Sequence, residues 1–231
     1  MLKVAIWPSH INTSLFEIKE DKGDWTLLFT KEAYSHFKDS GNIWIKKQLD
    51  SVAAKKIVSK AREIAIDPQS DSRVILDGVS VNLRLKIDNK ESSAEFRSPI
   101  SGSKEQDFMC DLIGLVKRNI EALESQNYIE LLEQYFFDVS PIKEINKNPY
   151  RIKLIGGLTI SDKEELTSKF ETLLSKKNPI LDMTNFYSIG RALNECFIAI
   201  EKVEGLTVLA NESAFSYLKE IDFDSSKVSI Q

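Results

Sequence analysis

Four polar residues in the second half of the chain, Asp182, Thr184, Asn185 and Ser188, lie at the end of a short apolar segment, Ile180–Met183. The segment is typical of a buried strand, and ligand sites in open α/β sheets lie beyond the carboxyl ends of strands. These residues are therefore a candidate site edge, which an enzyme would need to combine with a pocket and perturbed titratable groups. The favoured alternative is a capping and turn cluster that opens a helix at Ser188.

A second group of charged residues lies near the start of the chain. Glu17, Glu20, Asp21 and Asp24 are interspersed with two lysines and are followed by Trp25. We predict a hairpin turn here, with a modest negative patch beside an exposed tryptophan. An aromatic side chain within a charged rim is a common arrangement in protein-binding hot spots. The five residues are a candidate partner-binding surface.

The residues that most often carry metal or nucleophilic chemistry are sparse. The two histidines, His10 and His36, fall in different predicted elements without a nearby cysteine, so the usual zinc spacing is absent. We predict no metal and no cofactor. A Ser–His–Asp or Cys–His combination stays open, because such partners meet only in the fold. Cys110 and Cys196 lie in apolar helical patterns and are interpreted as buried free thiols, with a mutual disulfide as the alternative.

Two further patterns have a structural interpretation that we favour. Gly156-Gly157 lacks the spacing of a phosphate-binding loop, and a strand bulge or a tight crossing near the sheet edge explains the pair better than a phosphate-cradling turn. The basic run Lys55, Lys56, Lys60 and Arg62 lacks the interleaved aromatics of a base-stacking surface. We interpret it as the solvated face of an amphipathic helix.

Composition limits the function classes. The chain has 231 residues, a formal net charge of -4 and 42% hydrophobic residues. This is ordinary for a soluble globular protein, and the acidic balance argues against a nucleic-acid partner. No stretch approaches the roughly 18 consecutive apolar residues of a membrane span. The first residues are too interrupted by Pro8 for a signal peptide, so we expect a cytoplasmic protein that does not bind membranes.

The first half, residues 1–138, is predicted to be an α+β domain with an antiparallel meander plus helices. Its clearest signal is Val79–Ile87, where apolar and polar residues alternate with period two, as in the middle strand of an antiparallel sheet with one solvated face. Ser103 is predicted to cap a helix with Gln106. Further strands are predicted at Lys3–Trp7, Leu15–Lys19 and Trp25–Thr30, and helices at Lys31–Phe37, Ile43–Ile66, Lys104–Ser125 and Tyr128–Phe137.

Residues 139–149 are predicted to be a linker, because they hold two prolines and no apolar periodicity. After them, strands alternate with helices, which predicts a small α/β domain over 150–231 with a mostly parallel sheet. The expected strands are Arg151–Ile160, Ile180–Met183, Leu206–Ala210 and Val228–Ile230; the expected helices are Ser161–Ser175, Ser188–Lys202 and Glu212–Ile221.

The segment ILDGVSVNLRLKIDNKESSAEFRSPISGSKEQDFMCDLIGLVKRNI resembles bacterial immunity proteins of interbacterial toxin systems. The shared pattern is a DG turn, alternating strands, an aromatic strand that ends in Ser-Pro, a Gly/Ser linker and an amphipathic helix. The resemblance implies an acidic, non-enzymatic cytosolic protein that binds and blocks a cognate toxin, possessing no shared catalytic residues.

Residues from Tyr150 onward are similar to STAS domains, the fold of anti-sigma-factor antagonists. The similar pieces are IKLIGGLTI, ILDMTNF and LTVLANESAFSYLKEI with their intervening helices. The family carries a phosphorylated serine just before its second helix, and Ser188 is the nearest equivalent. Tyr187-Ser188-Ile189-Gly190 stands where the family has Asp-Ser-Ser-Gly.

Three function hypotheses follow. The first is a non-catalytic protein-binding module, most sharply an immunity protein that neutralises a toxin, whose partner would be a basic toxin domain. The second is a STAS-like regulatory protein controlled by phosphorylation at Ser188 or Thr184 or by partner binding. The third is an enzyme with a site at the Asp182–Ser188 edge.

Overall fold

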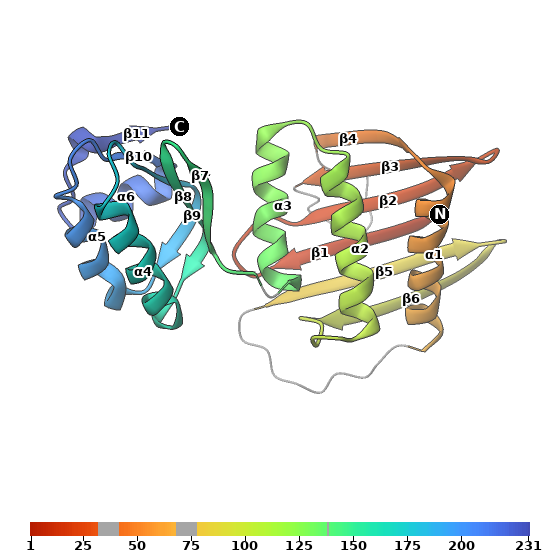
Figure 1. Ribbon diagram of the computed structural model, residues 1–231. Coiled ribbons are helices and arrows are strands. Elements are labelled where there is room, and N and C mark those ends of the chain that lie inside the picture. The colour runs from red at the N-terminus through yellow and green to blue at the C-terminus, as the bar shows by residue number, and fades with distance from the viewer. Residues whose placement is uncertain (32–41, 68–77, 138) are drawn as a thin grey trace. The chain divides into compact units, whose positions relative to one another are not determined.

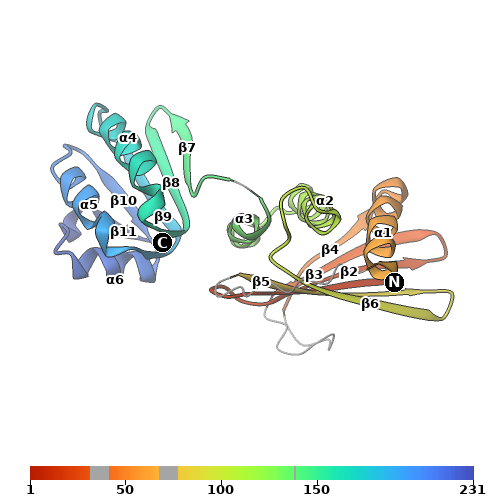
Figure 2. The ribbon, with the colours of Figure 1, turned by 90° about the horizontal axis from the view of Figure 1, so that it is seen from below.

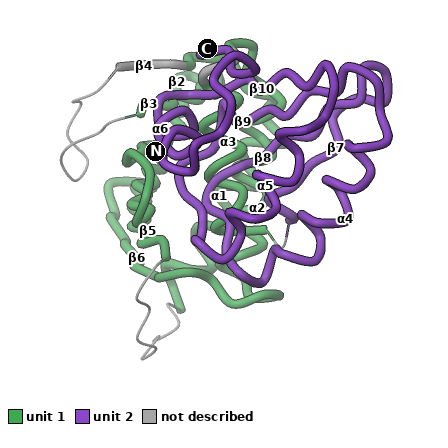
Figure 3. Tube along the Cα trace, turned by 90° about the vertical axis from the view of Figure 1, so that its left-hand side faces the viewer, with its two compact units in different colours: residues 1–137 green, residues 138–231 purple. Residues whose placement is uncertain are grey.

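The chain forms two compact units, and the computed structural model describes residues 1–31, 42–67, 78–137 and 139–231. Unit 1 spans Met1–Phe137 and unit 2 spans Asp138–Gln231 (Figure 3). Each unit has its own sheet and its own apolar cluster. The chain is α+β, as predicted. Residues 32–37 of one predicted helix, His36 among them, lie outside the described residues.

Unit 1 is built on a six-stranded sheet in the order β4-β3-β2-β1-β5-β6 (Figure 1). Every neighbouring pair is antiparallel. The alternation over Val79–Ile87 is confirmed as β5, which lies between β1 and β6. The strands are β1 (Leu2–Pro8), β2 (Ser14–Asp21), β3 (Asp24–Lys31), β4 (Asn42–Leu49), β5 (Val79–Ile87) and β6 (Lys90–Arg97).

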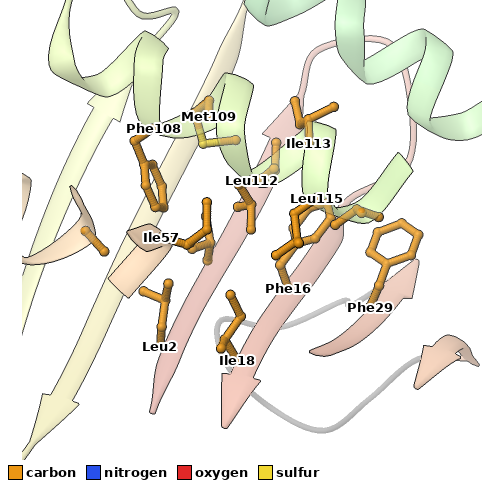
Figure 4. Packing of buried hydrophobic residues seen from close by; sticks show 14 of the residues in the cluster. Leu2, Phe16, Ile18, Phe29, Ile57, Phe108, Met109, Leu112, Ile113 and Leu115 are labelled. Atoms are coloured by element: carbon orange, nitrogen blue, oxygen red, sulfur yellow. The ribbon is translucent and has the colours of Figure 1, made fainter. Parts of the chain in front are cut away.

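Three helices cover one face of this sheet: α1 (Ser51–Ile66), α2 (Lys104–Arg118) and α3 (Leu123–Phe136) (Figure 2). Alternate strand residues point toward them because the side chains of a strand alternate between faces. Figure 4 shows the side chains of Phe108, Leu112 and Leu115 on α2 directed at the sheet, from which Phe16 and Ile18 of β2 point toward the helices. All five side chains are at most 4% exposed, so this layer is the core of unit 1.

Ion pairs join α1 to α2 above the core. Lys56 Nζ lies 2.8 Å from Asp111 Oδ2, and Lys60 contacts both Asp107 and Asp111. Burial raises the pKa of Asp111, but the hydrogen bonds from Lys56 and Lys60 lower it by more. The pKa of Asp111 therefore lies below its ordinary value. The basic run of α1 is thus partly engaged with its neighbouring helix and is not wholly a solvated face.

The prediction of one helix over Ile43–Ile66 is wrong in its first third. Residues 42–49 form strand β4, which pairs antiparallel with β3, and the helix begins only after Asp50. Asp50 is the N-cap, since its carboxylate accepts a hydrogen bond of 2.9 Å from the Ala53 backbone N–H. Ser103 is the N-cap of α2 as predicted, since it accepts from the Gln106 N–H at 3.1 Å; the Gln106 side chain, however, accepts from the Gly102 N–H and not from that of Ser103.

Unit 2 holds a five-stranded sheet in the order β11-β10-β9-β8-β7, in which β8 to β11 are parallel and β7 pairs antiparallel with β8. The mostly parallel sheet is confirmed. The strands are β7 (Ile142–Lys147), β8 (Tyr150–Leu158), β9 (Ile180–Ile189), β10 (Thr207–Ala210) and β11 (Val228–Ile230); the helices are α4 (Lys163–Leu174), α5 (Asn194–Ile200) and α6 (Glu212–Glu220).

All three helices of unit 2 contribute to one apolar cluster with alternate residues of the sheet. Ile152 and Leu154 of β8 and Leu181 and Met183 of β9 belong to this cluster. The residues between them, such as Asp182, therefore point to the opposite face of the sheet. This alternation decides where the polar cluster of β9 lies.

Three sequence predictions for unit 2 need correction. The predicted linker contains β7, which pairs with β8 and so is part of the sheet. The helix predicted to begin at Ser161 begins at Lys163, after a short 3₁₀ turn that Thr159 opens by forming a capping box with Asp162. The strand predicted to end at Met183 continues to Ile189, and its following helix is α5, which begins at Asn194.

Removal of the α1 cap should lower stability measurably. We expect Asp50→Ala to reduce the free energy of unfolding by about 1 kcal/mol, because the helix loses an acceptor for one of its unpaired N–H groups. Asp50→Asn keeps a side-chain oxygen at the same position, so it should lower the free energy of unfolding by only about a few tenths of a kcal/mol. Urea denaturation of both variants checks this; equal losses in the two would contradict the cap assignment.

Candidate functional site

Asp182 lies inside the sheet of unit 2 and not at its edge. It is the third residue of β9, and its register partners are Lys153 on β8 and Leu209 on β10. Its side chain is only 2% exposed. The expectation that it follows the carboxyl end of a strand is therefore wrong.

The Asp182 carboxylate is held by three hydrogen bonds. Arg151 donates from Nη2 to Oδ2 at 2.6 Å, and Thr184 donates to Oδ1 from its backbone N–H at 3.0 Å and from Oγ1 at 2.7 Å. Burial raises the pKa of Asp182, but the Thr184 hydrogen bonds and then the Arg151 guanidinium outweigh burial and lower it. The carboxylate is ionised at neutral pH.

These contacts favour a structural role for Asp182. A general base needs a pKa near the working pH and a free acceptor directed at a substrate. Asp182 has a lowered pKa, and both of its oxygens are occupied by donors from its own unit. The arrangement instead clamps β8 to β9, because Arg151 lies on one strand and Asp182 on the other.

The other three residues of the predicted cluster lie at different positions along β9 and differ in exposure. Thr184 is half-buried, Asn185 is 5% exposed, and Ser188 is exposed. Two register shifts against β8, near Met183–Thr184 and at Tyr187, each give β9 one extra residue. Ser188 is six residues from Asp182, which is roughly 20 Å along an extended strand. The structure does not bring the four predicted residues into one site.

Asn211, which the sequence analysis missed, joins the start of α6 to strand β9. Its Oδ1 accepts from the Ala214 N–H at 2.8 Å and so caps α6. Its Nδ2 donates to the carbonyl oxygens of Thr184 and Phe186 at 3.1 and 2.7 Å. The signal for the cap was an asparagine directly before a predicted helix, but nothing local indicated the bonds to β9.

The glycine pair lies within β8, opposite the second register shift. Gly156 has a φ of +78°, a conformation that favours glycine. A Cβ on Gly157 would lie 2.8 Å from Ser188 Oγ and 3.0 Å from the Tyr187 ring. The preferred interpretation as a strand bulge is confirmed, and the pair permits the close approach of Ser188.

The predicted acidic surface of unit 1 divides between the two faces of the sheet. Trp25 is 7% exposed and belongs to the helix-side core, so the prediction of an exposed tryptophan is wrong. Glu17 is 4% exposed on the opposite face and lies 2.5 Å from both Lys3 Nζ and Lys19 Nζ. Neither residue is available as part of an exposed acidic rim.

The remaining carboxylates are exposed at the tip of the β2–β3 hairpin. Glu20, Asp21 and Asp24 are all exposed, and Asp21 faces Asp24 as the last register pair. Lys22 and Gly23, with φ values of +50° and +92°, form the two-residue turn between them. Positive φ at both central residues is the type I′ pattern, whose twist matches that of the flanking strands. The hairpin therefore displays these carboxylates on a short and regular turn.

Within the described residues, the two cysteines and His10 show no reactive arrangement. Cys110 and Cys196 are free thiols. Burial raises the pKa of Cys110, and the carboxylates of Asp107 and Asp111 raise it further, which disfavours the reactive thiolate. The backbone N–H of His10 donates to the Tyr135 hydroxyl at 3.3 Å. In the part of the chain that the structure describes, no three His, Cys, Asp or Glu side chains are grouped to hold a metal ion.

Comparison with protein-family models, curated proteins and solved structures gave no match to the chain. Within the described ranges, none of the helices has both the length and the apolar character needed to cross a bilayer.

The Glu17 ion pairs should make stability depend on pH. Burial raises the pKa of Glu17, but hydrogen bonds from Lys19 and Lys3 bring it below the ordinary value of 4.5. A lowered pKa in the folded state stabilises the fold above pH 4.5, and this stabilisation is lost as pH falls through the folded pKa. We expect Glu17→Gln to cost about 1–3 kcal/mol at pH 7.

The cost should shrink below about pH 4.5 and disappear at lower pH, where the native carboxylate is also protonated. Urea denaturation from pH 7 to pH 2.5 measures this difference. Glu20→Gln on the same strand is the matched control and should change stability little, because Glu20 is exposed. A Glu17→Gln cost that is equal at all pH values would contradict the ion-pair interpretation.

Proposed function

We propose that this protein is a non-catalytic protein-binding module, and in its sharpest form an immunity protein that neutralises a cognate bacterial toxin. The observation that carries the proposal is the exposed group of carboxylates on the β2–β3 turn, namely Glu20, Asp21 and Asp24. We call this group the acidic tip. Only Lys22 offsets it within the turn.

The acidic tip suits recognition better than chemistry. Its side chains project from a type I′ turn, so little backbone freedom is lost when a partner orders them. Charged groups at the rim of an interface mainly accelerate association and select partners by the sign of their charge. The complementary partner is therefore a basic protein surface, as a basic toxin domain would present.

Two buried carboxylates support the same proposal. Asp182 and Glu17 are held by neighbouring donors within their own units. Such residues stabilise the units but are not poised for proton transfer. We therefore place the function of the protein at its exposed surface and not at these buried carboxylates.

Neutralising the acidic tip should weaken binding to a basic partner. The partner to test first is a toxin domain encoded beside this protein, measured with the full chain by surface plasmon resonance. We expect the triple variant Glu20→Gln, Asp21→Asn and Asp24→Asn to bind at least about tenfold more weakly, which corresponds to about 1.4 kcal/mol. Most of the loss should be in the association rate and should diminish at high salt.

The matched control removes three exposed carboxylates from unit 2 with the same change in charge: Glu171→Gln, Glu204→Gln and Glu220→Gln. If the control loses as much affinity as the tip variant, net charge rather than the tip drives binding. If the wild-type protein neither binds the neighbouring toxin nor protects cells from it, the immunity form of the proposal is wrong.

A STAS-like regulatory protein is the second candidate. The strand–helix alternation from β8 to β11 agrees with the succession of elements in the resemblance. Of the two candidate switch residues, Ser188 is exposed, whereas the Thr184 hydroxyl donates to Asp182 and is half-buried. A phosphoryl group at Ser188 would add about two negative charges close to Gly157.

Phosphoproteomics of the native protein separates the two candidates. Regulation by phosphorylation predicts modification at Ser188 and none at Thr184 under at least one growth condition. Ser188→Ala should abolish the modified species and leave toxin binding unchanged if the first proposal is correct. Unmodified Ser188 under all conditions would contradict the phosphorylation switch.

A further inference from the structure

Strand β6 forms a long and regular edge of the unit 1 sheet (Figure 1). Proteins often keep edge strands short or irregular, because an unpaired row of N–H and C=O groups can bond to another chain. Of the other edge strands within the described residues, β4 and β7 pair with their neighbours in irregular registers, and β11 has only three residues. In contrast, β6 pairs with β5 over eight residues in one continuous register and contains no proline.

The odd-numbered residues of β6 direct their backbone groups away from β5. The Lys86 N–H donates to the Met1 carbonyl oxygen at 2.9 Å, so the even-numbered residues of β5 bond toward β1. The odd-numbered residues of β5 bond to β6, as the Val79 carbonyl does by accepting from the Ser98 N–H at 2.8 Å. Their register partners on β6 are even-numbered. The residues with outward N–H and C=O groups are therefore Glu91, Ser93, Glu95 and Arg97, whose side chains are all exposed.

Charged side chains on an edge strand deter pairing with most other strands, but those of β6 are complementary to a second copy of β6. Two symmetric antiparallel registers use nearly the whole strand. A register centred on Ser93 pairs residues 90–96 and sets Glu91 opposite the partner's Glu95, where like charges are destabilising. A register centred on Ala94 pairs residues 91–97 and sets Glu91 opposite the partner's Arg97. A two-fold axis repeats each of these pairs, so the charges select the second register.

We propose that β6 pairs antiparallel with β6 of a second copy of this chain, about a two-fold axis at Ala94. The outward N–H and C=O groups of Ser93 then bond those of the partner's Glu95, and the backbone groups of Glu91 bond those of the partner's Arg97. The Arg97 side chain can bond the partner's Glu91 in addition to its contacts within its own chain, since a guanidinium has five N–H donors. The proposal rests neither on the acidic tip nor on toxin binding.

Ala94 suits the position on the axis. Its side chain lies in the helix-side core with that of Phe96, and both are at most 7% exposed. Two Ala94 residues that face each other across the axis form a pair without hydrogen bonds, in which the Cα atoms approach to about 4.5 Å. The methyl group is small enough for this approach. The two helix-side cores then meet through small side chains, and the paired sheets continue into each other.

Sedimentation equilibrium of the full chain tests the pairing. Edge pairing buries less surface than a standard interface, so we expect a reversible dimer that forms between about 5 and 500 μM protein. Arg97→Glu sets two pairs of like charges across the axis and should weaken association by about tenfold or more. Adding Glu91→Arg to Arg97→Glu restores opposite charges in this register alone and should restore the dimer. Arg191→Glu makes the same charge change at an exposed position of unit 2 and should leave association unaltered.

A backbone variant tests the hydrogen bonds directly. Ser93→Pro removes an N–H that points away from β5, and proline is tolerated on edge strands, so the fold should persist while the dimer is lost. Circular dichroism and urea denaturation check the fold. In the wild-type protein, amide hydrogen exchange at Ser93 and Glu95 should slow as the protein concentration rises. The amide of Ala94, which already bonds to β5, should be protected at every concentration.

Four results would overturn the proposal. The first is a monomer throughout the concentration range. The second is a dimer that persists in folded Ser93→Pro. The third is a folded double variant, Glu91→Arg with Arg97→Glu, that associates no better than Arg97→Glu alone. The fourth is protection of Ser93 and Glu95 only after a different protein is added, because the edge would then take a strand of that protein and not a second copy.

Discussion

The pairing of β1 with both β2 and β5 is the constraint on which unit 1 depends. β1 is paired on both edges, over Leu2–Ile6 with β2 and over Leu2–Pro8 with β5, and Val4 faces Phe16 on one side and Leu83 on the other. Without β5, the strands β1 to β4 would have an unpaired edge, and the β5–β6 hairpin would be isolated. Isolated two-stranded hairpins are marginally stable in water. The pairing joins segments about 80 residues apart, and α1 makes the connection across the helical face of the sheet.

The acidic tip depends on the same register. Leu2, the first residue of β1, pairs with Ile18 on β2, so the last residues of β2 extend beyond the end of β1. The β2–β3 hairpin continues to the pair Asp21 and Asp24 and therefore displays its turn at the end of the sheet.

Sequence reasoning succeeded where the pattern was local and regular. The alternation of β5, the Ser103 cap and the strand–helix alternation of unit 2 were predicted from neighbouring residues alone. It failed for β4, although Ile43, Ile45 and Leu49 carry a period of two. Lys47 occupies the apolar position in that alternation and pairs with Glu121 at 2.6 Å, a partner 74 residues away. The spacing of Ile45, Leu49 and Val52 then resembled the apolar stripe of a helix.

The exposure of Trp25 was predicted wrongly for a different reason. Trp25, Leu27 and Phe29 alternate along β3 and so lie on one face of the strand, which is the face that the helices bury. This alternation of β3 predicts a buried tryptophan, but the charged residues beside Trp25 suggested an exposed one.

The polar cluster on β9 shows why candidate sites are harder to predict than elements. Asp, Thr and Asn favour turns, because their side chains bond to nearby backbone groups. In this protein, the Asp182 carboxylate does bond to the Thr184 backbone, as in a turn, yet the segment remains a strand. Arg151 on β8 neutralises the buried charge, and Asn211 satisfies the carbonyl groups of Thr184 and Phe186 on either side of Asn185. Both partners come from elsewhere in the sequence, so no window around residue 182 contains them. A cluster of chemically capable residues therefore indicates a site only when their long-range partners leave an acceptor or donor unoccupied. For Asp182 those partners occupy both oxygens, and for this reason the exposed surfaces of unit 1 are better candidates for function than the interior of unit 2.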